Sequence, residues 1–123
     1  MQLTHEEFAD AVGEALASLP DEFRPYMEEL AVDIEDVPDA QTMSDLGIKD
    51  RRSLLGLYRG VPLTNRSVGQ MLRIPERVVL YQRNIERVCR TREQVVDQIR
   101  RTVLHEVGHH FGMGEAQLRR LGY

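Results

Sequence analysis

The chain has 123 residues and a mass of 14.2 kDa, of which 41% are hydrophobic and 29% charged, so we expect a single domain over residues 1–123 and no room for two. Its apolar runs are far shorter than the roughly 18 to 20 residues of a membrane span, and its first residues do not resemble a signal peptide, which favours a cytoplasmic protein without a membrane partner. The net charge of -4 argues against a nucleic-acid partner. Residues 1–50 carry 14 acidic and 2 basic residues, and we expect the more basic second half to fold against them.

The first half of the chain predicts one helix, one strand and one loop. Thr4 and Glu7 have the spacing of a capping box, and apolar residues follow at helical spacing, which predicts a helix from about Thr4 to Ser18. From Val32 to Asp36 apolar and acidic residues alternate, as in a half-buried strand. The polar segment 39–50, which contains a glycine, is predicted to be a loop.

Two further strands are expected in the middle of the chain. Residues 53–59 are interpreted as a strand, and the β-branched apolar run 77–81 as a buried strand followed by a helical stretch over 84–90. Residues 61–73 fit either an edge strand or a long loop. Together with the flanking helices, these strands predict a compact α+β fold.

A long helix is predicted at the end of the chain. Thr91 and Gln94 form a second capping-box pair, so the helix should begin near Arg92 and run to about Phe111. The glycines at 112 and 114 are expected to end it.

This helix contains the pattern His105-Glu106-Val107-Gly108-His109, the HExxH pattern of zinc hydrolases. Residues four apart lie nearly on one line of a helix, so His105 and His109 can direct two imidazoles at one metal ion. Glu106 is offset by about 100° and can reach a metal-bound water without ligating the ion. Since Cys89 is the only cysteine, a cysteine-based zinc site is excluded, and the metal ligands must be His, Asp or Glu.

A helical wheel separates these residues from the predicted core side of the helix. With His105 at 0° and about 100° per residue, His109 falls near 40° and Glu106 near 100°. The apolar residues fall between about 120° and 240°; they are Val96, Ile99, Val103, Val107 and Phe111. Arg100 lies inside this apolar sector, where a snorkelling side chain or an ion pair would account for it.

A catalytic zinc site typically uses three protein ligands, so a third ligand is needed. After His109 the candidates are His110 and Glu115. His110 is turned about 100° toward the core side, which leaves Glu115 as the better candidate. Gly112 and Gly114 can adopt positive φ and let the chain reverse, which would return the Glu115 carboxylate to the ion.

From about Leu30 onward the sequence resembles the small bacterial zincin-like metallopeptidases, also described as minimal metalloproteases. The resemblance is carried by Leu57-Tyr58-Arg59-Gly60, Val79-Leu80-Tyr81 and residues 102–112 around the HExxH pattern. It implies a zincin-like fold with a small mixed sheet packed on the active-site helix, and a metal-dependent hydrolase. The sequence departs from the family pattern at Glu115, where an aspartate is usual.

These observations predict a zinc-dependent metallopeptidase that hydrolyses a peptide or amide bond of a peptide or protein substrate. Glu106 would act as general base toward the zinc-bound water. The oxyanion needs another donor, for which His110, Tyr81 and Tyr123 are candidates by chemistry alone.

Two alternatives remain open. The first is a non-catalytic zinc-binding or protein-interaction module that retains the zincin fold. The second is an Fe(II) oxygenase, because two histidines and a carboxylate also match the facial triad of those enzymes. The oxygenase would leave Glu106 without a role.

Overall fold

The computed structural model describes residues 1–28, 30–59, 76–110 and 115–120, and of residues 109, 110, 115, 117 and 118 it gives the backbone only. Its helices are α1 (His5–Ala17), α2 (Arg24–Met27), α3 (Ala40–Leu46), α4 (Gln82–Arg87), α5 (Arg92–His110) and α6 (Glu115–Arg120). Its strands are β1 (Ala31–Glu35), β2 (Gly56–Arg59) and β3 (Arg77–Tyr81). The predicted α+β class is confirmed. Within the described part of the chain, no helix is both long and apolar enough to span a membrane.

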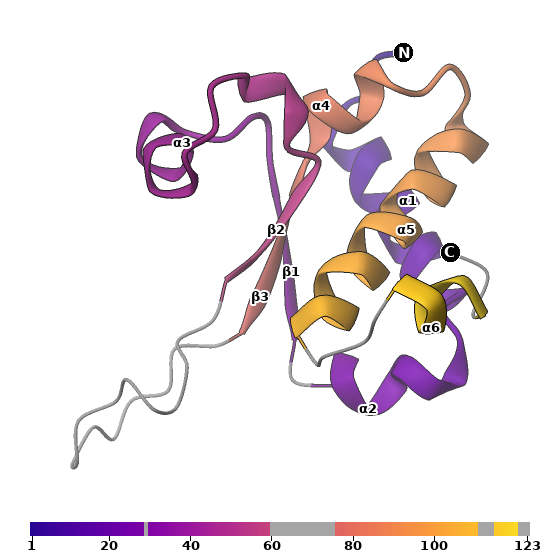
Figure 1. Ribbon diagram of the computed structural model, residues 1–123. Coiled ribbons are helices and arrows are strands. Elements are labelled where there is room, and N and C mark those ends of the chain that lie inside the picture. Colours follow the sequence, from indigo (N-terminus) through magenta and orange to yellow (C-terminus); the bar gives the residue numbers. More distant parts are fainter. Residues whose placement is uncertain (29, 60–75, 111–114, 121–123) are drawn as a thin grey trace, which may run out of the picture.

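The three strands form one mixed sheet in the order β1-β3-β2. β1 runs parallel to β3, and β2 runs antiparallel to it, with Val78 of β3 opposite both Val32 and Tyr58. In Figure 1 the sheet is seen nearly edge-on, with α1 and α5 on one side of it and α3 on the other. The small mixed sheet beside a long helix agrees with the expectation from the sequence.

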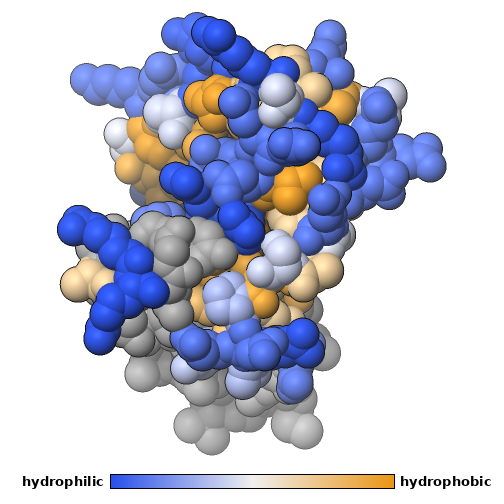
Figure 2. Space-filling model, turned by 90° about the vertical axis from the view of Figure 1, so that its right-hand side faces the viewer, coloured by the Kyte–Doolittle hydropathy of each residue, from blue (hydrophilic) through white to orange (hydrophobic). Residues whose placement is uncertain are grey.

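The core lies between the sheet and the helices α1 and α5. Val78 and Leu80 of β3 point into this core, whereas Val79 and Tyr81 alternate with them and are buried on the other face of the sheet. Burial on both faces explains why β3 is a continuous apolar run. On the helix side of the molecule, shown in Figure 2, hydrophilic side chains cover most of the described surface, and smaller hydrophobic areas lie between them.

Helix α1 begins as its sequence predicts. The Thr4 hydroxyl accepts a hydrogen bond from the Glu7 N–H at 3.1 Å, and the Glu7 carboxylate accepts one from the Thr4 N–H at 2.9 Å, which completes the capping box. The buried face of α1 consists of Phe8, Ala11, Val12 and Ala15. This face packs on α5 and forms the second layer of the core.

The segment 39–50 contradicts the prediction of a loop, because it contains α3. The Asp39 carboxylate caps the helix by accepting from the Thr42 N–H at 2.7 Å, and Gly47, with φ of 66°, ends it in the left-handed conformation. Thr42 is the one buried residue of α3, so the helix lacks the apolar stripe that would have revealed it.

Strand β2 begins later than predicted. The Asp50 carboxylate accepts from the Arg52 N–H and caps a 3-10 turn over residues 51–53, so the strand starts at Gly56. The predicted edge strand or long loop over 61–73 lies outside the described residues.

Gly56 allows β2 to lie directly against α5. A Cβ atom at this position would lie 2.5 Å from Thr102 Cγ2 and 3.2 Å from the Val79 carbonyl oxygen. Thr102 is buried, and its hydroxyl donates to the Gln98 carbonyl at 2.7 Å, so turning this side chain away would break that bond. The close approach of β2 and α5 therefore depends on this glycine.

We predict that Gly56→Ala lowers the free energy of unfolding by about 1–3 kcal/mol, measured by urea denaturation, because the added methyl group overpacks the contact. Gly13→Ala is the control: Gly13 is exposed on α1, and a Cβ atom there would meet no atom within 4 Å outside its own stretch of helix, so it should stabilise the protein by about 0.5–1 kcal/mol. Adding Thr102→Ser to Gly56→Ala removes the clashing methyl and should restore part of the loss. Equal stability of the wild type and Gly56→Ala would contradict this account of the contact.

Candidate metal centre

Helix α5 carries the HExxH pattern and begins where the sequence predicts. The Thr91 hydroxyl accepts from the Gln94 N–H at 3.1 Å. The Gln94 side chain accepts from the Arg90 N–H at 2.7 Å and not from Thr91, so the reciprocal bond of the cap is shifted by one residue. The first of these bonds satisfies an N–H group in the first turn of α5, which then continues through the whole pattern.

The apolar side of α5 is buried as the helical wheel predicts. Ile99, Val103 and Val107 are fully buried, and Val96 is partly buried against the core, while Phe111 lies outside the described residues. The buried surface is wider than predicted, because it also includes Leu104, Val95 and Thr102. On the same wheel Val95 and Thr102 fall at about 80° and about 60°, between His109 and Glu106, so burial reaches the ligand side in the earlier turns of the helix. These residues pack α5 against α1, β2 and β3.

Arg100, the exception in the apolar sector, forms an ion pair within α5. Its guanidinium lies 2.6 Å from the Asp97 carboxylate, and Asp97 also pairs with Arg101 at 2.9 Å. The side chain of Arg100 is about a third exposed, with a relative accessibility of 31%. This arrangement is the ion pair that was one of the two explanations for a charged residue in the apolar sector.

His105 and Glu106 are half-buried near the end of α5, between the buried residues Leu104 and Val107. His109 follows His105 by four residues of the same helix, which corresponds to a rise of about 6 Å and a rotation of about 40°. Among the side chains that the structure describes, no three His, Cys, Asp or Glu residues are gathered into a metal-binding group. The side chains of His109 and Glu115 lie outside that set, so ligation by these residues stays a prediction.

Glu115, the proposed third ligand, is the first residue of α6. This helix contacts α5, and Figure 1 shows it beside the C-terminal end of α5. The described part of the chain after the HExxH pattern, α6, therefore lies against α5, as a ligand at Glu115 requires. The two glycines that were expected to form the reversal, Gly112 and Gly114, lie outside the described residues.

Tyr58 is a polar residue on the α5 side of the sheet, and it was not among the candidates predicted from the sequence. It lies opposite the core residue Val78 and packs against the core. Gly56 of β2 lies beside Thr102 of α5. Tyr58 is two residues further along β2, about 6–7 Å from Gly56. Glu106 is four residues further along α5, about 6 Å from Thr102. Figure 1 shows that β2 and α5 descend in the same direction. Tyr58 is therefore level with the HExxH pattern.

The environment of Tyr58 keeps its hydroxyl protonated. Burial raises the pKa of Tyr58 well above its ordinary value of 10.0, and a hydrogen bond and the negative charge of Glu76 raise it further. The hydroxyl is thus neutral over the whole physiological range, and it donates its one proton to Glu76. Only the pairing of β2 with β3 shows which face of the sheet it occupies, so the sequence could not select it.

Tyr81, one of the three oxyanion donors considered from the sequence, points the other way. It alternates with Leu80 and lies fully buried on the sheet face opposite α5. Burial raises the pKa of Tyr81, and Arg59 on that same face lowers it in part. The other two candidates, His110 and Tyr123, have no described side chain.

The sequence from residue 27 to residue 123 matches the family described as zincin-like metallopeptidase. The chain belongs to this family. The zincin-like chain also resembles the solved structure of a conserved hypothetical protein from Thermus thermophilus, with 21% identity and a TM-score of 0.52 over 95% of this chain and 99% of that one. This similarity concerns the fold alone. No curated protein matches the chain.

We predict that Tyr58 makes the stability of the zincin-like chain sensitive to alkaline pH. In the unfolded chain its phenol ionises near pH 10, whereas the folded environment holds the proton, so stability is full below pH 10 and falls as the pH rises above it. From about pH 9 to about pH 11 the free energy of unfolding should fall in both proteins. The fall should be about 1 kcal/mol smaller in Tyr58→Phe than in the wild type. Urea denaturation at both pH values measures this, and parallel losses in the two proteins would contradict it.

Proposed function

We propose that this protein is a zinc-dependent metallopeptidase that cleaves a peptide or amide bond of a peptide or protein substrate. The observation that supports it most strongly is the position of the HExxH pattern on α5. Most of the circumference of that helix is anchored in the core, while His105 and Glu106 remain partly accessible. Membership of the zincin-like metallopeptidase family supports the same reaction class.

The donor set suits zinc. His105 and His109 would supply two imidazole nitrogens from successive turns of α5, and Glu115 at the start of α6 would supply a carboxylate oxygen. Three such ligands leave one position open for water or substrate, as in other catalytic zinc sites. When bound, zinc polarises the scissile carbonyl group and lowers the pKa of a coordinated water toward about 7.

Glu106 would handle the proton of the reaction. Its position next to His105 but about 100° around the helix places its carboxylate beside the ligand line rather than on it. From there it would accept the proton of the attacking water and return it to the leaving amine. Tyr58, which stays protonated and lies level with the pattern, is our candidate donor to the oxyanion, for which its one O–H would exchange the Glu76 carboxylate for the substrate oxygen.

We predict that the purified wild-type protein binds one zinc ion per chain, as measured by elemental analysis and by competition with a chromogenic chelator. His105→Ala and His109→Ala should each weaken zinc binding by at least about a hundredfold, since each removes one of three ligands. His5→Ala is the control, because His5 lies on α1 and bonds Gln82 and Asp36. Full zinc affinity in His105→Ala would contradict the site, and full affinity in Glu115→Ala would remove Glu115 from it.

Glu106→Gln should keep the zinc ion and lose hydrolysis, because the amide cannot accept the proton. We expect kcat to fall by about 10²–10⁴-fold in a peptide-library cleavage assay. An unchanged function of Glu106→Gln would identify the protein as a non-catalytic zinc-binding module.

Tyr58→Phe and Tyr81→Phe form a matched pair, since each removes one hydroxyl from a buried part of the sheet. Tyr58→Phe should lower kcat by about a hundredfold with little change in KM, whereas Tyr81→Phe should leave turnover nearly unchanged. Equal effects of the two substitutions would assign Tyr58 a structural role.

A further inference from the structure

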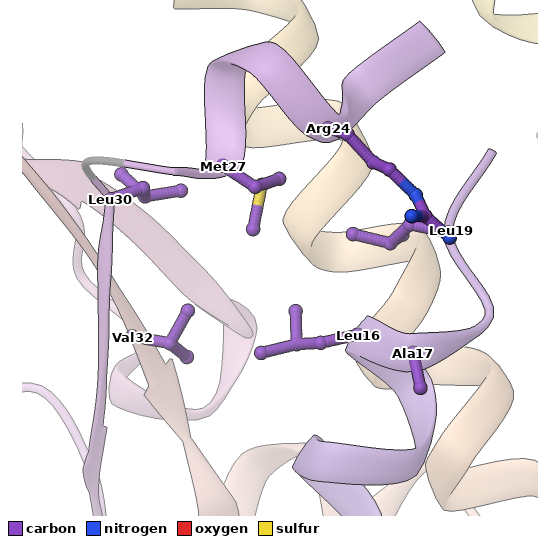
Figure 3. Close-up of a pocket in the computed structure, with 7 residues that line it drawn as sticks. All are labelled: Leu16, Ala17, Leu19, Arg24, Met27, Leu30 and Val32. Carbon is purple, nitrogen blue, oxygen red and sulfur yellow. The ribbon is translucent and has the colours of Figure 1, made fainter. Parts of the chain in front are cut away.

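A small apolar pocket lies at the edge of the sheet that is remote from β2. It has a volume of about 300 Å³, at the lower end of the range for ligand pockets. In Figure 3, Leu16 of α1, Met27 of α2 and Val32 of β1 point toward one common space, and Leu30 borders it. The pocket has room for one large apolar side chain.

The pocket adjoins a strand edge that is open within the described part of the chain. In the sheet order β1-β3-β2, β1 has β3 on one side and no described strand on the other. The Ala31 N–H bonds the Glu76 carbonyl next to β3, so by alternation the N–H groups of Val32 and Ile34 point outward. An open edge of this kind can pair with an extended peptide.

The pocket and the strand edge have the geometry of a single binding site. A strand added beside β1 would lie about 4.8 Å from it and would direct every second side chain to the same face as Val32. On that face, the pocket between β1, α1 and α2 lies next to Val32. One apolar side chain of such a peptide would thus enter the pocket while its backbone pairs with β1.

The charge around the pocket indicates what kind of peptide would bind. Residues 5–35, which build the pocket and β1, contain ten acidic residues and one basic residue, Arg24. Arg24 already pairs with Asp21 at 3.1 Å. Glu14 and Asp33 are paired with Arg92 and Arg77, whereas Glu22 and Glu28, which flank α2 beside the pocket, are exposed. A basic peptide complements this charge.

We propose that the β1 edge and its pocket form a docking site for an extended basic peptide segment with one large apolar residue as anchor. The site is separate from the HExxH pattern, because α5 approaches the sheet at β2, the opposite edge. The docked segment is therefore not the one positioned for cleavage. The docking site does not depend on a bound metal or on turnover.

The test uses the full chain with the substitution Glu106→Gln, with and without zinc, so that a bound peptide is not cut. The probe is a fluorescein-labelled nine-residue peptide in which lysine and threonine alternate around a central leucine, and binding is followed by fluorescence anisotropy. We expect binding that weakens by about tenfold when serine replaces the leucine, and that weakens with increasing salt. A peptide with glutamates in place of the lysines should not bind.

Two pairs of variants locate the site. Met27→Trp fills the pocket and should weaken binding by about tenfold, whereas Leu46→Trp, on exposed α3, should not change it. Glu28→Lys, next to Met27 on the surface, should weaken binding by about threefold at low salt, and the equally exposed Asp45→Lys should have no effect. NMR spectra should show that the peptide shifts the amide signals of Val32 and Ile34.

Three results would overturn the docking site. The first is equal affinity for the leucine and serine peptides, and the second is equal binding by Met27→Trp and Leu46→Trp. The third is self-association of the wild type in sedimentation experiments that Met27→Trp abolishes, since the occupant would then be a second copy of the chain. Zinc content and hydrolysis test the proposed function separately, so a failure of either proposal is recognised on its own.

Discussion

The structure depends on the close packing of α5 between α1 and the sheet. β2 approaches this helix at Gly56, where any side chain would collide with Thr102. On the same helix Ile99, Val103 and Val107 are completely buried. Because burying each such side chain contributes about 1.5–3 kcal/mol, rotating α5 about its axis would be costly. The core therefore fixes which side of α5 remains accessible.

This constraint gives the HExxH pattern its chemical meaning. Histidines four residues apart share a line on any helix, but they form a metal site only if the helix holds that line away from its buried side. Here His105 is half-buried next to fully buried Leu104, so the orientation of α5 sets the direction of the imidazole. The same packing brings Tyr58 to the level of Glu106, which joins the sheet to the site. Fold stability and catalysis would thus share one helix.

Much of the fold could be predicted from the sequence, because its signals are local. The capping residues of α1 and α5, the alternation in β1 and the apolar run of β3 each indicated the observed element. α3 was missed because its caps at Asp39 and Gly47 were not matched by an apolar stripe. Tyr58 could not be selected, since its face depends on pairing with β3. The role of Glu115 depends on the path of the glycine-containing segment before it, which local preferences do not determine.

The central claim is that α5 directs His105 and His109 at one zinc ion. X-ray absorption spectroscopy at the zinc edge of the zinc-loaded protein tests this most directly, because it reports the atoms bound to the metal. The account predicts two imidazole nitrogens at about 2.0–2.1 Å, with the remaining ligands oxygen. A spectrum without imidazole scattering, or with a sulfur ligand from Cys89, would contradict it.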